Sequence, residues 1–390
     1  MAEIYLDNSA TTRPFEEVIE LQSRIQRENY GNPSSIHARG VAAEKLLDEA
    51  RRSIAQLLQC REEEICFTSG GTEANNLALK GAAYRWRRRG NHIITTQIEH
   101  PSVLNCCRRL EEEGFTVTYL PVDEQGYVDL EQLERALRKE TILVSIIHVN
   151  NEIGTIQPVE KIGALIKSRH PRALYHVDGV QSFAKIPTPV QRWQADLYSC
   201  SAHKIHGPKG AGALWVRKGV SLQPLFQGGD QEQGLRPGTE NTPAIAAFGL
   251  AARLCAAQMA ENAARLYHLK EKLCRELEEA GVEFYINGPP PAEAAPHVLN
   301  LSFPGIKAEV LLRLLEAREI YVSPGSACHS RRPDPSHVLT AIGLEEARLS
   351  GALRFSFSSF NDEEEMERVA EAIAAGIREL KALAGRRPGQ

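Results

Sequence analysis

With 390 residues, the chain exceeds the roughly 250 to 300 residues at which a single hydrophobic core stops growing, so we expect a large domain and a smaller one. Its 46 Lys and Arg residues nearly balance 50 Asp and Glu residues, giving a net charge of -4, which argues against nucleic acid as a direct partner. The sequence shows no secretory signal pattern and no apolar run of about 18 residues, and its eight cysteines form no C-x-x-C pair. We therefore expect a soluble, cytoplasmic protein with reduced cysteines and no contact with a membrane.

Short β-branched runs alternate with helical stretches over the first part of the chain. This pattern is typical of an α/β fold in which a mostly parallel sheet is covered by helices on both faces. Seven strands are predicted, at 64–69, 92–97, 115–120, 141–149, 174–179, 196–201 and 212–218. The helices predicted between them include 73–89 and 129–140. We assign residues 14–255 to this large domain.

The remainder of the chain predicts a smaller α+β domain, made of residues 1–13 and 256–390. An Ala-rich helical stretch from about residue 242 to 280 is long enough to bridge the two domains. A Pro- and Gly-rich segment then breaks the pattern. Further elements are predicted at 297–303, 307–318, 319–325 and 352–359, and as a helix from Asn361 onward.

The segment FTSGGTEANN at 67–76 predicts an anion site. A strand ends there and a helix begins at once, so free backbone N–H groups and the helix dipole face the same point. Gly70 and Gly71 allow close approach of the backbone, and the Thr72 hydroxyl is a further donor. An ordinary helix N-cap is the alternative interpretation.

The segment YHVDGVQS places Asp178 at the carboxyl end of a predicted strand, where open α/β sheets bind ligands. A carboxylate there can keep a pyridine nitrogen protonated, and Gln181 follows within one turn. A simple helix cap would use the same residue type.

The segment SCSAHKIHGPKG carries Lys204 directly after another predicted strand. A lysine held in a site can form a Schiff base with an aldehyde, and Ser201 and His203 lie close enough in sequence to bind the phosphate of the same ligand. A lone lysine is usually a solvated surface group. Anion turn, pyridine acid and Schiff-base lysine together indicate pyridoxal 5'-phosphate (PLP).

Three further residues are candidates for chemistry on that cofactor. His100 follows a predicted strand and opens a helix, where an imidazole can stack on a flat ring and move protons, although a capping or core histidine is the alternative. Cys328 lies in SPGSACHS among small, polar neighbours and is a candidate nucleophile. Arg354 lies in a predicted strand and suits a substrate carboxylate, with a surface ion pair as the alternative.

The chain resembles the cysteine desulfurases of the NifS/IscS type, which are PLP-dependent members of the class V aminotransferase family. The motifs that carry this resemblance occur in order from residue 5 to 360: YLDNSATT, GNPSS, FTSGGTEANN, EH, HVNNEIG, HVDGVQS, SAHKIHGPKG, RPGTEN, SGSAC and RFSFSSF. It implies the PLP-dependent transferase fold type I and a homodimer with active sites near the subunit interface.

The resemblance also implies a role for each matching residue. Lys204 would carry the Schiff base, Asp178 would pair with the pyridine nitrogen, Gln181 with the phenolic oxygen, and His100 would stack on the ring. The phosphate would be bound by Gly71, Thr72, Ser201 and His203, joined by Thr239 of the partner subunit, and Ala202 would be a further cofactor-binding residue. Asn150, close to the cofactor, and Arg354 would bind the substrate carboxylate.

The implied reaction takes sulfur from L-cysteine onto Cys328 as a persulfide and releases L-alanine, with Lys204 and His100 as the other catalytic residues. The persulfide would pass to a sulfur-acceptor protein, for iron–sulfur cluster assembly or tRNA thiolation. No metal site is expected, apart from an iron–sulfur cluster that Cys328 would transiently share with a scaffold protein. Pro324 replaces the usual serine of the family's cysteine motif.

Other activities remain open at this point. A selenocysteine lyase or a small aminotransferase would use the same fold, but an aminotransferase has no need of a nucleophilic thiol at Cys328. A non-catalytic scaffold for sulfur transfer is a third possibility, and intact Lys204, Asp178 and Cys328 argue against it.

Overall fold

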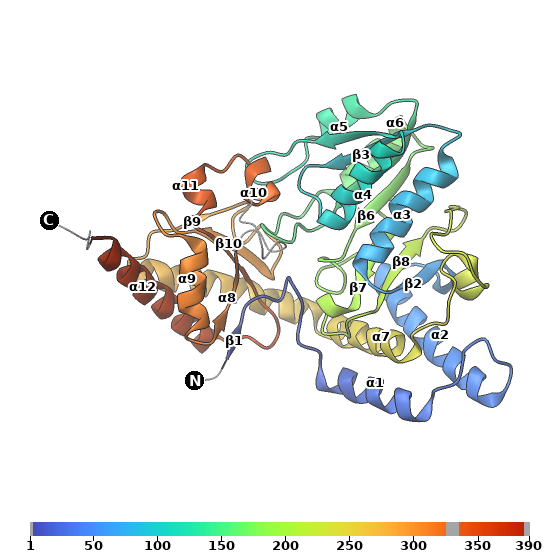
Figure 1. The fold of residues 1–390 in the computed structure, drawn as a ribbon, viewed down its shortest axis with the longest axis horizontal. Coiled ribbons are helices and arrows are strands. Elements are labelled where there is room, and N and C mark those ends of the chain that lie inside the picture. The colour runs from blue at the N-terminus through green and yellow to red at the C-terminus, as the bar shows by residue number, and fades with distance from the viewer. Residues whose placement is uncertain (1–2, 325–334, 386–390) are drawn as a thin grey trace.

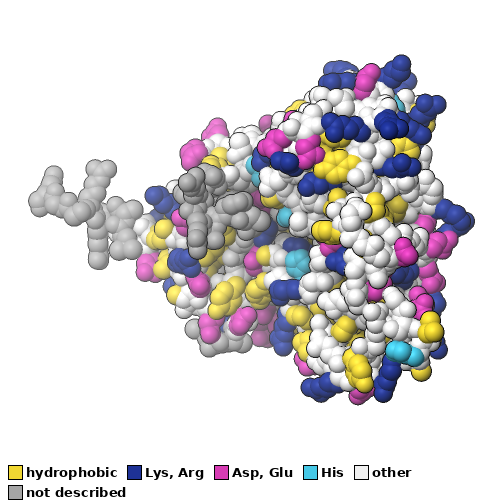
Figure 2. All heavy atoms as spheres, turned by 45° about the vertical axis from the view of Figure 1, so that its right-hand side comes forward, with side chains coloured by type: hydrophobic (Ala, Val, Ile, Leu, Met, Phe, Trp, Pro, Cys, Tyr) yellow, Lys and Arg dark blue, Asp and Glu magenta, His cyan; other side chains and the backbone are white. Residues whose placement is uncertain are grey.

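The computed structural model describes residues 3–324 and 335–385. Figure 1 shows a large sheet covered by helices at one end of the molecule and a second, smaller group of strands and helices at the other end, which also contains both termini. Acidic and basic side chains are interspersed over the face drawn in Figure 2. This mixing agrees with the small net charge of -4.

The large sheet has seven strands in the order β2-β8-β7-β6-β5-β3-β4. Their bounds are β2 Ile65–Thr68, β3 His92–Thr96, β4 Thr116–Leu120, β5 Thr141–Ile147, β6 Leu174–Asp178, β7 Leu197–Ser201 and β8 Gly212–Val216. Only β8 runs against its neighbours, pairing antiparallel with both β2 and β7. The predicted α/β fold with a mostly parallel sheet is confirmed, and each predicted strand is present.

Helices cover both faces of this sheet (Figure 1). Helices α3 (Gly71–Trp86) and α4 (Pro101–Glu112) pack on one face, around core residues such as Leu77 and Val103. The other face packs against α1 Glu16–Glu28, α2 Ala38–Leu58, α5 Leu130–Ala136, α6 Val159–Arg169 and α7 Thr242–Ala257. Adjacent residues Leu143 and Val144 of β5 belong to the two different cores, as the alternation along a strand requires.

The second group of elements has its own core. Its four-stranded sheet has the order β12-β13-β10-β9, and β1 pairs in parallel with β11. The elements are β1 Ile4–Tyr5, α8 Met259–Glu279, β9 Tyr285–Ile286, β10 Val298–Ser302, α9 Ala308–Glu316, β11 Ile320–Tyr321, β12 Ser323–Pro324, α10 His337–Ala341, α11 Glu346–Leu349, β13 Ala352–Ser356 and α12 Glu363–Gly385. Short 3₁₀ helices complete the chain at η1 Glu62–Glu64, η2 Ala202–Lys204 and η3 Gln231–Gly234.

The Ala-rich stretch predicted as one helix is two. α7 ends and α8 begins at Gln258, whose φ of -116° and ψ of 8° are not helical, and the two helix axes differ by 70°. No Pro or Gly marks this break, so tertiary packing decides it: α7 packs on α2, and α8 packs on α12. Among the described residues, no single helix has the length and apolar composition to cross a membrane, and only this bent pair meets both criteria together.

The domain division at residues 13/14 and 255/256 stays a prediction. Core residues of the large sheet lie between Val18 and Cys255, whereas those of the second core lie at Ile4, at Leu6 and between Leu266 and Ile377. A fourth cluster joins the two parts, with Ile98 and Ile147 on one side and Val338 on the other.

Candidate active site

A cavity of about 630 Å³ lies between the two parts, at the carboxyl ends of the large sheet's strands. Of the predicted site residues, it is lined by Gly71, Thr72, His100, Asp178, Gln181, Ser201, His203, Lys204 and Arg354. Segments far apart in sequence therefore meet at one place, as expected for an open α/β sheet, which binds ligands at this edge.

Lys204 is positioned by the N-terminal segment of the chain. It ends η2, directly after β7, and its Nζ donates to the carbonyl oxygens of Ser9 (2.5 Å) and Ala10 (2.7 Å). His203 holds the same segment, because its carbonyl accepts from the backbone N–H and the hydroxyl of Thr12. Two peptide carbonyls thus orient the amine in the cavity.

Asp178 ends β6 and is 2% exposed. Its Oδ1 accepts from the backbone N–H of Val180 at 3.0 Å and its Oδ2 from Nδ2 of Asn75 at 2.7 Å. Burial raises the pKa of the Asp178 carboxyl, and the two hydrogen bonds and the charge of Lys204 oppose that shift. The carboxylate is held in a fixed orientation and suits a cationic ring nitrogen, whose charge would offset the cost of burial.

An anion cradle lies at the start of α3. Gly70 is the N-cap residue, so the first N–H groups of a 16-residue helix face the cavity. A Cβ on Gly71 would lie 2.6 Å from Cγ2 of Val180, so any larger residue there would have to displace the Val180 side chain. The hydroxyl of Ser201 is buried beside this turn and has no hydrogen-bond partner among the described residues. A buried, unpartnered donor at a helix N-terminus is suited to a phosphate oxygen.

His100 is the N-cap of α4, and its Nδ1 accepts from the backbone N–H of Ser102 at 3.1 Å. Because Nδ1 is an acceptor, the neutral ring carries its proton on Nε2. Burial, followed by the charge of Lys204, lowers the pKa of His100 to about 4. The imidazole is therefore neutral at physiological pH.

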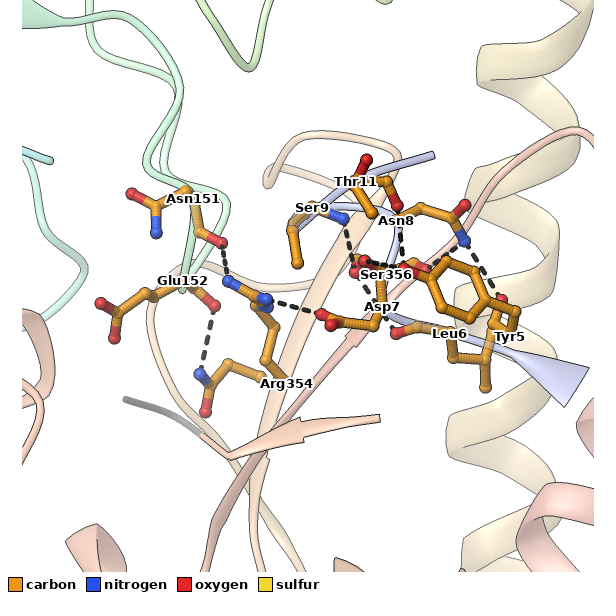
Figure 3. Close-up of polar contacts among 12 residues, drawn as sticks. Tyr5, Leu6, Asp7, Asn8, Ser9, Thr11, Asn151, Glu152, Arg354 and Ser356 are labelled. Atoms are coloured by element: carbon orange, nitrogen blue, oxygen red, sulfur yellow. Dashed lines mark hydrogen bonds and ion pairs between the residues drawn. The ribbon is translucent and has the colours of Figure 1, made fainter. Parts of the chain in front are cut away.

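Arg354 projects from β13 and is 1% exposed (Figure 3). Its Nη2 lies 2.7 Å from Oδ1 of Asp7 and its Nη1 donates to the carbonyl of Asn151 at 3.0 Å. Its Nε has no partner among the described residues. A buried, oriented guanidinium on the cavity wall suits a carboxylate ligand.

The family model for the class-V aminotransferases matches residues 4–369. The chain belongs to the class-V aminotransferase family. It is 44% identical over 378 residues to a cysteine desulfurase IscS of Methanosarcina thermophila, covering 97% of this chain and 93% of that protein. It is likewise 44% identical to a putative cysteine desulfurase IscS 1 of Bacillus subtilis, covering 97% of this chain and 100% of the relative.

Solved structures of the same family agree in fold. A NifS-like protein superposes with a TM-score of 0.91 at 40% identity, covering 97% of this chain and all of that one. A structure described as SspA in complex with cysteine gives a TM-score of 0.80 at 36% identity, covering 93% of this chain and 100% of the other. The predicted resemblance to this family is confirmed.

In this class-V aminotransferase, three of the predicted site residues that the structure describes do not line the cavity. Ala202 is buried in η2, and Thr239 is exposed. Both ends of the Asn150 side chain bind the protein backbone: its Nδ2 donates to the carbonyl of Ile98, and its Oδ1 accepts from the backbone N–H groups of Glu152 and Ile153. The roles predicted for these residues remain predictions.

Asn151, the neighbour of Asn150, lines the cavity instead. The motif HVNNEIG contains both residues, and the sequence alone does not distinguish them. Ser9, Ala10, Asp7 and Asn75 were also not identified from the sequence as site residues. The motif YLDNSATT was the signal for three of them, but they act in part through backbone carbonyls, whose position only the fold determines.

Cys328 lies outside the described residues. The described residues on either side of its segment contact two other parts of the chain. Ser323 of β12 pairs with Arg354 of β13, and Ser336, the N-cap of α10, donates its hydroxyl to the buried carboxyl of Glu152. No cluster of three or more potential metal ligands occurs in the parts of the chain that the structure describes.

Proposed function

We propose that this protein is a PLP-dependent cysteine desulfurase, which takes sulfur from L-cysteine onto Cys328 and releases L-alanine. The observation that carries the proposal is the arrangement of Lys204, Asp178 and the Ser201 cradle around one cavity, with Arg354 on the same cavity. The names of the family's relatives, cysteine desulfurase IscS among them, support it.

The residues of the cavity fit PLP group by group. The unpartnered Ser201 hydroxyl and the N–H groups of Gly71 and Thr72 suit its phosphate, together with His203. Asp178 suits the pyridine nitrogen, Gln181 the phenolic oxygen, and His100 a face of the ring. Lys204 would bind the aldehyde. Bound there, PLP supplies an electron sink for negative charge at the substrate's α-carbon.

Proton movements are assigned to two side chains. Nζ of Lys204 would accept the α-proton of the substrate, and the carbonyls of Ser9 and Ala10 orient it for this step. His100 is neutral with its proton on Nε2, so it can donate that proton or recover it. The guanidinium of Arg354 binds the substrate carboxylate, and Asp7 holds its orientation.

The thiolate of Cys328 attacks the sulfur of the substrate, and the C–S bond breaks with its electron pair left on the substrate carbon. The sulfur remains on Cys328 as a persulfide, and the carbon takes up a proton to become the methyl group of alanine. The other cysteines suit this step poorly, because burial raises the pKa of the Cys60 thiol to about 12 and that of Cys274 to about 11. The persulfide then passes to a sulfur-acceptor protein, for iron–sulfur cluster assembly or tRNA thiolation.

The assembly is part of the same proposal. We infer a cytoplasmic homodimer built from a large domain of residues 14–255 and a small domain of residues 1–13 and 256–390. Thr239 is exposed in one chain, and this supports a contact of Thr239 with the partner subunit's cofactor phosphate.

The deciding experiment measures sulfide and alanine release from L-cysteine by the wild type, Cys328→Ser and the control Cys274→Ser, each with bound PLP verified by absorbance. We expect near-complete loss of both products for Cys328→Ser, retention of its cofactor, and wild-type activity for Cys274→Ser. Wild-type activity in Cys328→Ser would exclude the persulfide mechanism. A Lys204→Ala variant that retained the colour of the bound cofactor would exclude the assignment of Lys204.

A further inference from the structure

The side-chain amide of Gln181 is held at both of its ends. Its Nε2 donates to the carbonyl oxygen of Ser9 at 2.9 Å. Its Oε1 lies 3.3 Å from Nζ of Lys185 and 3.2 Å from Nε2 of His297. One acceptor therefore lies at the nitrogen end, and two nitrogen groups lie at the oxygen end.

These contacts allow only one orientation of the amide. A peptide carbonyl cannot donate, so the group facing Ser9 must be the NH₂ of Gln181. A flipped amide would direct its oxygen at the Ser9 carbonyl and its NH₂ at the Lys185 amine. Such a flip would place two acceptors together at the Ser9 end and two donors together at the Lys185 end.

Lys185 and His297 are available as donors. His297 is 1% exposed, and burial lowers the pKa of its ring well below the usual value, so it is neutral. Its Nδ1 has no partner among the described residues, and the contact with an amide oxygen assigns its proton to Nε2. Burial, together with the nearby charge of Lys204, lowers the pKa of Lys185 to about 7. An amine can donate in both of its protonation states.

The fold brings Lys185 and His297 to Gln181 from two directions. Lys185 lies four residues after Gln181 in the turn that follows β6, and His297 directly precedes β10 of the other sheet. Both line a small cavity of about 50 Å³, and Lys204 lines this cavity as well as the larger one. The titratable groups around Lys185 also include His206, Cys255 and Arg354.

We propose that Lys185 and His297 are positioning residues that fix the amide of Gln181, so that its second N–H faces the large cavity and donates to the phenolic oxygen of the cofactor. The proposal rests on the proposed function, because it needs PLP in that cavity. Gln181 is the residue that contacts the ligand, and Lys185 and His297 act through it.

The test compares Lys185→Met, which removes the donor, with Lys185→Gln, which keeps a neutral N–H donor. The readouts are the dissociation constant of PLP and the pH at which the absorbance of bound PLP changes. For Lys185→Met we expect about fivefold weaker PLP binding, the equivalent of about one neutral hydrogen bond, and an upward shift of the absorbance midpoint by about one pH unit. A donor to the phenolic oxygen stabilises its negative charge and so disfavours the protonated form of the Schiff-base nitrogen beside it. Removal of the donor therefore raises the pH of the absorbance midpoint. Lys185→Gln should stay close to wild type.

A double-mutant cycle separates positioning from charge. In a Gln181→Leu background, Lys185→Met should cause almost no further change in either readout, because the residue through which it acts is absent. An effect of Lys185→Met that is equally large with and without Gln181 would overturn the proposal, and so would a Lys185→Gln variant as impaired as Lys185→Met.

His297→Leu provides an independent test if Lys185→Met does not fold, which circular dichroism and thermal unfolding would show. It should shift the absorbance midpoint in the same direction, and an unchanged midpoint would overturn the role of His297. Failure of the proposed function is distinguishable, since the wild-type protein would then bind no PLP at Lys204.

Discussion

The carboxylate of Asp7 lies 2.7 Å from Nη2 of Arg354, which joins two residues 347 positions apart in the sequence. The backbone supports this pair, because Asp7 forms a β-bridge with Ser356, two residues beyond Arg354 (Figure 3). Arg354 is 1% exposed, so its charge depends on Asp7 and on the carbonyl of Asn151 for compensation. The N-terminal segment is therefore part of the active site wall.

Replacement of Asp7 by Asn should destabilise the PLP-free protein. The buried guanidinium of Arg354 would lose its carboxylate partner, and we expect the free energy of unfolding to fall by about 1 to 3 kcal/mol, less than for a fully buried pair because the Asp7 side chain is 24% exposed. Urea unfolding measures the change. Asp48→Asn, on an exposed face of α2, is the control and should stay within about 0.5 kcal/mol. Equal stability of Asp7→Asn and wild type would contradict the prediction.

Ser201 and Ser199 form a matched pair on β7. Both are buried, but the Ser201 hydroxyl has no partner among the described residues, whereas Ser199 Oγ lies 2.9 Å from Nε2 of His176. Ser201→Ala should leave the PLP-free protein as stable as wild type and weaken PLP binding about tenfold, since a hydrogen bond to a charged phosphate oxygen is lost.

Ser199→Ala should show the reverse pattern, with a loss of about 1 kcal/mol in stability and unchanged PLP affinity. Thermal unfolding of the PLP-free proteins and spectroscopic titration with PLP measure the two quantities. An unchanged PLP affinity in Ser201→Ala would exclude this hydroxyl from the phosphate site.

Asn150 and Asn151 are adjacent and should behave differently. Asn150→Ala leaves three buried backbone groups without their partner, those of Ile98, Glu152 and Ile153, so we expect a loss of about 2 to 4 kcal/mol in stability. Asn151→Ala should keep its stability within about 1 kcal/mol and lower kcat/KM for L-cysteine about tenfold, because this residue lines the cavity. A larger loss of kcat/KM in Asn150→Ala at full stability would return the substrate role to Asn150.

Glu99 should make stability decrease with rising pH. It is fully buried, its Oε1 accepts from Ile147 and Thr96, and its Oε2 has no partner among the described residues. Burial, followed by the charge of Asp178, raises the pKa of Glu99 from 4.5 to about 8. The folded protein therefore binds a proton that the unfolded chain releases, and the resulting stability is lost as the pH rises toward the folded pKa.

Glu99→Gln imitates the protonated carboxyl and removes this dependence. Between pH 6 and pH 8 the wild type should lose about 2 kcal/mol of stability relative to Glu99→Gln. Urea unfolding at both pH values gives the difference, and Glu20→Gln on the exposed face of α1 is the control. A constant difference between wild type and Glu99→Gln would show that Glu99 is ionised in the folded protein.

The sequence predicted the large sheet well because its central strands β5, β6 and β7 are buried on both faces and read as short apolar runs between turn residues. The edge strand β4 is more exposed. The prediction failed where the signal is not local. The break between α7 and α8 carries no Pro or Gly, and the helices α1 and α2 at the beginning of the chain were not predicted. Their sequences are amphipathic, but they contain no motif that marks a strand end or a binding site.

By itself, the sequence determined the fold class, the family and the side chains that meet at the ends of the parallel strands, since strand ends and helix starts fix where a side chain lies along the sheet. Lys204, Asp178 and Ser201 were found in this way. Only the tertiary structure decided the contacts that cross between distant segments: Asp7 with Arg354, Ser9 with Lys204 and Gln181, and Asn151 in place of Asn150 on the cavity wall. Several of these contacts use backbone carbonyls, which every residue has. The role of such a carbonyl depends on where the fold places it, and the amino-acid type does not determine that position.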